Sequence, residues 1–459
     1  MKNPLVVALF LSVACFAARA QISGPCGETS NQAKVGCTLS TLYGASGHLP
    51  VYQGGVPAAG DSGFDFVPNP TALDATLGTE LTTLPLTAPG SGFVYQFDKA
   101  SGLEVRSTQS LGPILAERGD TIGKHKLFAA FAYEYFKFNS ENGISMKSLN
   151  GVLQHEQDNP PEAEDSDLVT TNDAIDLKIH EFTAFATFGL TDRIDVSAVI
   201  PFLNVRMGAY STATIYNVSQ PLVHAFCPSP TLAAPCTTMN FSNFREATGI
   251  GDAVFRLKAR VWGGERTKLA AGIDFRAPTG DELNFRGSGT YGVRPFAALS
   301  FSKNRFAPHA NIGFQANGDS ILAGSLAAGT KAHLPNEFTY SAGTDIGVTH
   351  NFTIAADWLG EHLIDGYSLQ KSTCSETYPP SGGAVSSTCI QGSAATGSGT
   401  LTFPEDVTLR SGYNVDDLAV GAKLSPAKNL IITVNGLFKL DDAGLRATVV
   451  PLAGIGYTF

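Results

Sequence analysis

The sequence GIGDAVFRLKARVWGGERTKLAAGIDF, which runs from Gly249 to Phe275, shows the pattern that decides the fold. Every second residue from Ala253 to Val261 is apolar, and the residues between them are mostly cationic. After a short polar connection, Gly263–Thr267, the alternation resumes and continues to Phe275. A period of two is typical of β-strands, and two such segments across a short link predict a hairpin.

The same alternation recurs from Lys124 to the end of the chain, Phe459, and predicts about twelve strands, an even number as expected for a bacterial single-chain barrel. The connections mostly alternate between long and short. Polar segments 139–172, 206–247 and 365–404 are predicted to be long loops, whereas the short connections are polar turns. Transmembrane barrels place short turns at the periplasmic end and long loops outside. We therefore predict an all-β, antiparallel, up-and-down transmembrane barrel over residues 124–459.

The start of the chain indicates export. A positive Met1–Asn3 region, an apolar stretch and Ala18-Arg19-Ala20 before Gln21 fit a secretory signal peptide over residues 1–20. A lipoprotein signal at Cys15 is a weaker interpretation. Mean hydropathy is +0.04 and no second long apolar run follows, so a membrane location would require a closed barrel.

Composition excludes some functions. The net charge of −10 argues against a nucleic-acid partner, which requires a basic field. Six cysteines form three close pairs in sequence, typical of disulfides that staple loops in exported proteins. These pairs are Cys26 with Cys37, Cys227 with Cys236, and Cys374 with Cys389. Their spacing does not fit a metal site, and no cofactor is expected.

Residues 21–123 differ from the rest, because they are rich in Gly, Pro, Ser and Thr and lack long alternation. We interpret them as an irregular N-terminal extension. Two interpretations remain open at this stage: a disordered periplasmic arm, or a plug in which Leu111–Asp120 enters the barrel.

The cost of charge in lipid predicts which face of each strand points inward. An Arg or Lys at the bilayer midplane costs about 2–4 kcal/mol, so these residues should face the lumen. The candidate lumen-lining residues are Arg256, Lys258, Arg260, Lys268, Asp274, Arg276, Arg294, His309, Asp345, Asp357, Glu361 and Lys423. The simplest role for any one of them is to neutralise and solvate a polar interior.

Several short motifs resemble those of the outer-membrane transporters grouped as the phenol-degradation meta-pathway family. They are Gly249-Ile-Gly-Asp252 with Phe255-Arg-Leu-Lys258, Ala277-Pro-Thr-Gly-Asp281, and the terminal Gly454-x-Gly456-Tyr457-x-Phe459. Weaker similarity begins at Gly112. The resemblance implies an outer-membrane barrel associated with the uptake of aromatic or other small hydrophobic compounds, and it supplies no catalytic residues.

Alternation that reaches a terminal aromatic residue, Phe459, also resembles the C-terminal signature of outer-membrane barrels. It predicts the barrel-assembly machinery as a partner, besides outer-membrane lipid and a small-molecule solute.

The leading functional hypothesis is passage of a small molecule through a narrow polar lumen in the outer membrane. One alternative is a structural or adhesive protein that acts through its long loops. A less favoured alternative is a lipid-modifying enzyme that uses His350 or His362 on the apolar face. The acidic run Glu162–Asp167 is interpreted as a solvated loop in preference to a site for divalent cations beside lipopolysaccharide.

Overall fold

The computed structural model describes residues 24–44, 49–53, 56–57, 70–84, 95–98, 103–106, 110–154, 167–216, 224–228, 236–264, 266–378, 386–387 and 399–459. The predicted signal peptide and most of the acidic run Glu162–Asp167 lie outside these ranges. No helix in the described part of the chain is long and apolar enough to cross a membrane.

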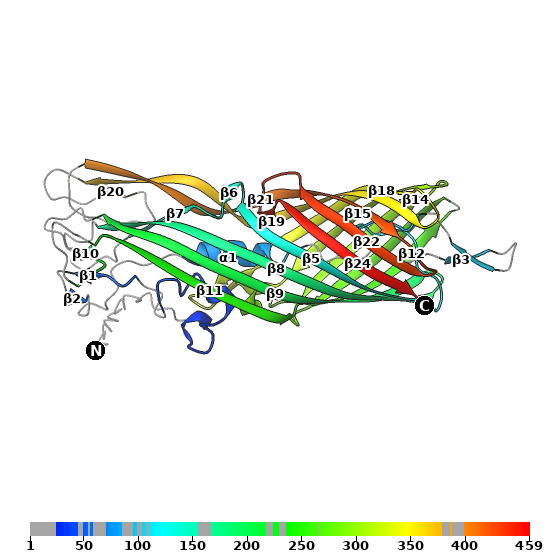
Figure 1. The fold of residues 1–459 in the computed structure, drawn as a ribbon, viewed down its shortest axis with the longest axis horizontal. Coiled ribbons are helices and arrows are strands. Elements are labelled where there is room, and N and C mark those ends of the chain that lie inside the picture. The colour runs from blue at the N-terminus through cyan, green and yellow to red at the C-terminus, as the bar shows by residue number, and fades with distance from the viewer. Residues whose placement is uncertain are drawn as a thin grey trace, which may run out of the picture.

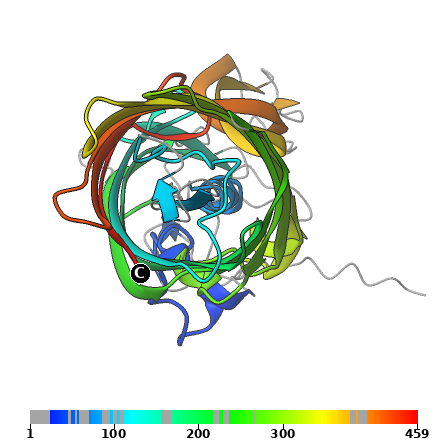
Figure 2. The ribbon, with the colours of Figure 1, turned by 90° about the vertical axis from the view of Figure 1, so that its right-hand side faces the viewer.

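Twelve antiparallel strands close into a barrel, which confirms the predicted fold class (Figures 1 and 2). Two strands in succession, β11 and β12, both pair with β9 and together form one strand of the wall. The wall consists of β5 (Leu127–Glu141), β8 (Leu168–Thr191), β9 (Ile194–Tyr216), β11 (Thr238–Ile250), β12 (Ala253–Gly263), β13 (Thr267–Ala277), β14 (Gly292–Phe301), β15 (Phe306–Asn317), β18 (Asn336–Gly347), β19 (Phe352–Tyr378), β21 (Gly399–Leu424), β22 (Leu430–Lys439) and β24 (Val449–Thr458).

The barrel closes where the last strand, β24, pairs with the first, β5. The Phe459 N–H donates to the Leu127 carbonyl at 2.8 Å, so the ladder continues to the last residue of the chain. Shorter strands pair with the wall strands β5, β8 and β19. They are β6 (Ile144–Ser145), β7 (Leu149–Gln154), β20 (Ser386–Ser387) and β23 (Leu445–Ala447).

The remaining strands form small separate sheets. They are β1 (Tyr52–Gln53), β2 (Val56–Pro57) and β10 (His224–Ala225); β3 (Tyr95–Asp98) and β4 (Leu103–Arg106); and β16 (Asp319–Ser325) and β17 (Thr330–His333).

The outside of the barrel is apolar around the end with the short turns. Phe131 is 66 % exposed and Leu257 is 48 % exposed, whereas Lys258, the next residue along β12, is only 4 % exposed. Because neighbouring residues of a strand point to opposite faces, charge inside and apolar side chains outside follow from the alternation. This is the surface expected of a barrel in lipid.

Above this belt the polarity of the two faces is reversed. The inward side chains Phe136, Ile179 and Val205 are buried in one large apolar core, whereas the outward residues Lys137 and Arg206 are exposed. The reversal indicates that here the barrel stands in water on its outside and is filled by apolar groups on its inside.

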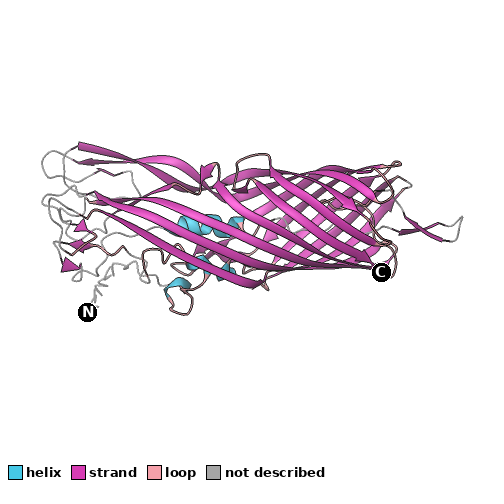
Figure 3. Cartoon of the chain, in the orientation of Figure 1, coloured by secondary structure: helices cyan, strands magenta, loops and turns pink. Residues whose placement is uncertain are grey.

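The predicted loop boundaries were wrong for this upper part. The strand β9 continues to Tyr216, β11 begins at Thr238, and β19 and β21 extend the wall through much of 365–404 (Figure 3). The alternation used for the prediction fades there because outward positions such as Thr212 and Thr214 are polar.

The motif Gly249–Asp252 lies within the wall. Gly251-Asp252 interrupts the strand that β11 and β12 form together. The Gly251 N–H still donates to the Pro201 carbonyl at 2.8 Å, and a Cβ at this position would lie 2.9 Å from the Pro201 ring.

Parts of the N-terminal extension fill the upper barrel. The helix α1 (Pro70–Glu80) lies within the ring of strands, so the extension is not wholly irregular (Figure 2). Segment 24–44, with the 3-10 turns η1 (Pro25–Gly27) and η2 (Val35–Cys37), packs into the same core. We call 24–44, α1 and the core around them the apolar layer.

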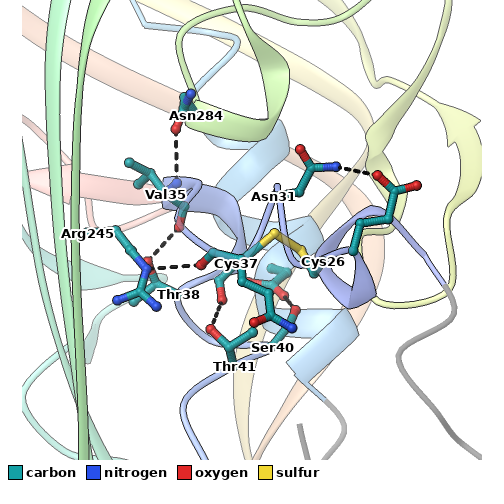
Figure 4. The surroundings of a disulfide bond; sticks show 12 residues. Cys26, Asn31, Val35, Cys37, Thr38, Ser40, Thr41, Arg245 and Asn284 are labelled. Atoms are coloured by element: carbon teal, nitrogen blue, oxygen red, sulfur yellow. Dashed lines mark hydrogen bonds between the residues drawn. A yellow bond between two sulfur atoms is a disulfide. The ribbon is translucent and has the colours of Figure 1, made fainter. Parts of the chain in front are cut away.

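The disulfide Cys26–Cys37 staples segment 24–44 (Figure 4). The Val35 N–H donates to Asn284 Oδ1 at 3.1 Å, which attaches the segment to η4 (Glu282–Asn284) between β13 and β14. Cys227 and Cys236 form the second predicted disulfide. Cys374 is disulfide-bonded too, and its predicted partner Cys389 lies outside the described residues.

Candidate functional site

The lower lumen contains an extended piece of chain, Ser110–Gly123, which we call the inner segment. It has no helix or strand of its own, and its residues hydrogen-bond to inward side chains of the wall. Together with these wall residues it forms the ionic layer of the barrel.

Acidic side chains of the inner segment bind cations of β12 and β13. Glu117 Oε2 lies 3.0 Å from Lys258 Nζ, and Glu117 Oε1 accepts from Arg256. Asp120 lies 2.8 Å from Lys268 Nζ and 3.4 Å from Arg260 Nη1. Burial opposes ionisation of Glu117, but Lys258 and Arg256 more than offset it and lower its pKa.

A second set of contacts joins the inner segment to β15, β18 and β19. Asp357 Oδ2 accepts hydrogen bonds from the Ile114 and Leu115 N–H groups, each at 3.0 Å. The other oxygen of Asp357 lies 2.8 Å from His309 Nε2, and Asp345 binds Arg118 at 3.3 Å.

The lysine of β21 completes this set of contacts. Lys423 is fully buried and donates to the Pro113 carbonyl at 2.5 Å. The inner segment is therefore held from both sides of the lumen.

Glycines let the inner segment run directly against the wall. A Cβ at Gly119 would lie 2.2 Å from the Lys268 carbonyl oxygen, and a Cβ at Gly189 would lie 1.8 Å from the Gly123 oxygen. At these two positions only glycine leaves room for the backbones to approach.

A cavity of about 250 Å³ lies inside the barrel beside the inner segment. Its apolar lining includes Leu84, Leu115, Phe296 and Leu359, and its polar lining includes both charged and uncharged side chains. Thr82–Leu84, which follow α1, line the cavity on the side of the apolar layer. The cavity therefore lies between the apolar layer and the ionic layer.

Cations and carboxylates are mixed in the cavity lining. Asp274 receives two hydrogen bonds from Arg256, at 2.7 and 2.9 Å, and two from Arg294, at 2.6 and 3.0 Å. The Arg256 guanidinium also lies over the Phe296 ring, 4.8 Å from its centre. Glu361 and further carboxylates lie on β18, β19 and β21.

All twelve predicted lumen residues lie on wall strands around these two features. Those that line the cavity are Arg256, Asp274, Arg276, Arg294 and Glu361. The others contact the inner segment directly or contact a wall residue that binds it. They are Lys258, Arg260, Lys268, His309, Asp345, Asp357 and Lys423.

Sequence reasoning missed the charged residues of the inner segment and two carboxylates of the cavity lining. Glu117, Arg118 and Asp120 were not among the candidates, because the segment that carries them has no periodicity. Glu337 and Asp417 line the cavity and were also missed. For these two the signal existed, since each alternates with apolar neighbours on a predicted strand.

The helix α1 carries two buried acidic residues of the apolar layer, Asp74 and Glu80. Asp74 on α1 is 1 % exposed and accepts from Ser40 Oγ at 2.9 Å, and burial raises its pKa to about 8. Burial likewise raises the pKa of Glu80 to about 8, and nearby Glu141 adds to that shift. Glu80 accepts from the Tyr413 hydroxyl and from the Leu445 N–H.

The histidines of the enzyme hypothesis lie apart from the lumen. His350 is exposed in the turn between β18 and β19. His362 Nδ1 lies 2.7 Å from Asn414 Oδ1 on the outer face, but the side-chain position that faces Nε2 belongs to Gly412. Within the described ranges, no group of His, Cys, Asp and Glu is placed to hold a metal ion.

Comparison with known families gives one match. The family model described as "Putative MetA-pathway of phenol degradation" matches residues 174–367, somewhat less than half of the chain. The resemblance read from the motifs is confirmed over this range. No curated protein matches the chain. The match and the closed barrel with its apolar belt support a location in the outer membrane.

Solved structures of outer-membrane barrels are similar at low identity. The COG4313 outer membrane channel from Pseudomonas putida F1 is 12 % identical, with a TM-score of 0.38, and the alignment covers 74 % of this chain and 97 % of that one. A FadL homologue from Pseudomonas aeruginosa is 10 % identical, with a TM-score of 0.28 and coverage of 72 % and 88 %. The TodX monoaromatic hydrocarbon channel is 9 % identical, with a TM-score of 0.29 and coverage of 83 % and 98 %. At such low scores these likenesses assign no residue and no substrate.

Proposed function

We propose that this protein is an outer-membrane channel for small molecules that combine an apolar body with a polar group. The supporting observation is the cavity between the two layers that fill the barrel. A solute would enter from the end with the long strands, bind in the cavity and leave past the inner segment toward the end with the short turns.

The size of the cavity supports this substrate class. A dry cavity of roughly 150 Å³ is enough to bind benzene. The cavity here measures about 250 Å³, which leaves space for a ring that carries one or two substituents. Sugars and peptides of several units would not fit without movement of the wall or of the inner segment.

The lining supports the same class. Leu115, Phe296 and Leu359 provide apolar contact, and binding sites for small molecules combine such contact with a few polar groups that fix orientation. Arg294 and Glu361 offer donors and acceptors to a hydroxyl or carboxyl substituent. The description of the matching family, phenol degradation, agrees with a phenol as the first solute to test.

In this proposal the inner segment is the plug of the channel. Ionic and polar contacts hold its middle part, and Leu111 and Ile122 add apolar contacts with the wall near its two ends. Passage requires that it shifts, or that the solute moves along its edge.

Uptake by liposomes that contain the purified protein tests the proposal. A phenol should enter faster than in empty liposomes, and faster than a disaccharide. Leu359→Trp fills the cavity from β19 and should reduce phenol entry by about tenfold or more, since 1.4 kcal/mol of lost binding corresponds to a factor of ten. Ile354→Trp on the outer face of the same strand is the matched control and should leave entry unchanged.

Two outcomes would contradict the proposal. One is equal entry of phenol and disaccharide. The other is equal rates for the two tryptophan variants, each shown to be folded by its heat-dependent shift in gel mobility.

The other functions considered from sequence receive less support. No feature described above favours adhesion. We propose no catalytic role either, because Gly412 occupies the position where a nucleophile beside His362 would have to stand.

We also propose that the barrel-assembly machinery recognises the C-terminus. Phe459 is 64 % exposed and lies on the outer surface beside Tyr457, with ring centres 4.8 Å apart. Deletion of Phe459 should lower the amount of folded protein in the outer membrane but leave refolding in detergent unchanged.

A further inference from the structure

Three basic residues lie side by side on the outer face of β5, β8 and β9. Lys137 is directly opposite Lys178 in the ladder between β5 and β8, and Lys178 is directly opposite Arg206 between β8 and β9. Directly opposite residues have Cβ atoms about 5 Å apart, so the Cβ atoms of the three residues span about 10 Å. We call these three residues the basic row.

The basic row lies just above the apolar belt. On β8 the outward residues from Leu190 to Phe182 are apolar, and Lys178 follows after His180. A tilted strand needs about 9–11 residues to cross the hydrocarbon. Counted from the end with the short turns, the basic row therefore falls in the headgroup region of the outer leaflet.

Aromatic residues mark the same depth independently. Directly below the row, the Tyr135 and His180 rings lie 4.8 Å apart, and the Tyr133 hydroxyl lies 2.8 Å from His180 Nδ1. Tyr133 also packs against Phe182. Tyrosine is enriched at membrane–water interfaces, with its ring at the level of the headgroups.

The inner faces of the same strands give a third indication of depth. Inward residues change from polar Glu134 and Glu181 to apolar Phe136 and Ile179 at this level. The reversal of polarity that separates the lipid-facing wall from the water-facing wall thus coincides with the basic row.

The charges of the row are only partly compensated within the protein. Like charges directly opposite on neighbouring strands destabilise a sheet. Lys178 pairs with Asp176 at 2.5 Å and Arg206 with Glu246 at 3.0 Å, and all four side chains remain 31–50 % exposed. Lys137 is exposed, and the described residues provide no carboxylate partner for it. An anion bound across the row would offset this repulsion.

From this geometry we infer that the basic row binds the phosphate groups of lipopolysaccharide in the outer leaflet. The inference rests on the outer-membrane location and not on transport. The acyl chains of the lipid would cover the belt residues Phe182 and Phe202, and its phosphates would accept hydrogen bonds from the row above them.

Binding of purified lipids to the full-length protein in detergent tests the inference. The probes are bisphosphorylated lipid A, the same lipid after removal of both phosphates, and inorganic phosphate. The variant Lys137→Ser/Lys178→Ser/Arg206→Ser should bind bisphosphorylated lipid A at least tenfold more weakly than the wild type, measured by native mass spectrometry. Because these side chains are on the surface, the variant should fold normally.

The matched control removes the same charge at the other end of the barrel. Arg193→Ser/Lys303→Ser/Lys428→Ser changes three exposed residues near the short turns, and it should bind lipid A like the wild type. Equal binding by the row variant and the wild type would overturn the inference. So would equal binding of the dephosphorylated lipid. Full displacement of lipid A by millimolar inorganic phosphate would overturn the lipid assignment in favour of a small-anion site.

Discussion

The ionic layer and the apolar layer fill the same barrel by different physical means. In the ionic layer Glu117, Asp120 and Arg118 each meet a wall residue of opposite charge. In the apolar layer α1 and segment 24–44 bury side chains such as Leu77, which is fully buried. The first layer depends on a small number of specific pairs, whereas the second depends on total area removed from water.

The difference suggests which layer moves. A buried ion pair contributes little net stability compared with apolar packing, because desolvation opposes the attraction. Loss of one partner is nevertheless costly, because the other charge remains buried alone. The ion pairs thus hold the inner segment in one position. The segment can leave that position when other groups neutralise the same charges. The apolar layer has no comparable alternative.

The largest effect is expected from Glu117→Gln. The change removes the 3.0 Å partner of Lys258 and leaves it with the more distant Asp195, at 4.0 Å; loss of one member of a buried pair costs about 3–5 kcal/mol. We expect the inner segment to leave its place while the wall stays closed. Since 1.4 kcal/mol is a factor of ten, the open population should rise by about a hundredfold or more, which conductance in planar bilayers would show.

Asp442→Asn is the control for this experiment. Like Glu117→Gln it removes one negative charge, but from an exposed ion pair with Lys439 that lies outside the lumen. Conductance should stay at the wild-type level. If Glu117→Gln also left conductance unchanged, the inner segment would not be the plug.

The apolar layer should respond to Leu77→Ala in the opposite way. Removal of a fully buried leucine from a packed core costs about 2–5 kcal/mol, depending on how far the site collapses. We expect a lower midpoint for heat-induced unfolding and no rise in conductance. A rise in conductance without loss of stability would show that the apolar layer, and not the ionic layer, controls passage.

The sequence was informative where one physical rule applied along a whole strand. Alternation with apolar residues such as Leu257 outside and Lys258 inside predicted the barrel and its lumen residues, because the cost of charge in lipid leaves no other orientation. It failed above the membrane, where β9 runs to Tyr216 with polar residues outward. There the outward residues are polar and the inward residues apolar, which is the reverse of the arrangement in lipid, so these strands were interpreted as loops.

The inner segment could not be placed by any local rule. Glu117 and Asp120 bind residues 141 and 148 positions away in the chain, and no periodicity announces such pairs. The excess of cations over carboxylates on β12 and β13 could have indicated that carboxylates come from elsewhere, but this signal was not used. The apolar layer was missed although a signal existed, because Leu73, Leu77 and Leu81 repeat every four residues, a spacing typical of one face of a helix.

A pH dependence should distinguish the two layers. In the apolar layer, burial raises the pKa of Asp74 from 3.8 to about 8, so the folded protein retains a proton that the unfolded chain loses near pH 4. The stabilisation from that proton is complete below about pH 4 and is lost as the pH rises to about 8. Asp74→Asn, which cannot ionise, should therefore reduce the fall in the unfolding midpoint between pH 5 and pH 9.

For Glu117 in the ionic layer the sign of the pH dependence is opposite. Because Lys258 and Arg256 lower the pKa of Glu117, the ionised form favours the folded state, and that contribution is lost only as the pH falls through the lowered pKa. Glu117→Gln should therefore leave the change between pH 5 and pH 9 as it is in the wild type. The assignment would be wrong if Asp74→Asn and the wild type lost stability equally over this range.

The smallest effect is expected where an exposed pair joins the apolar layer to the loop between β13 and β14. Lys34 Nζ lies 2.8 Å from Asp281 Oδ2, and both side chains are about 30 % exposed. Exposed pairs contribute about 0.2–1 kcal/mol, and Asp281 would keep Asn284 at 2.8 Å and Arg286 at 3.4 Å after Lys34→Ala. The unfolding midpoint should therefore shift slightly, and the shift should shrink in high salt. A loss as large as that of Leu77→Ala would mean that segment 24–44 is held by this single ion pair, and that the apolar layer resembles the ionic layer more than its packing suggests.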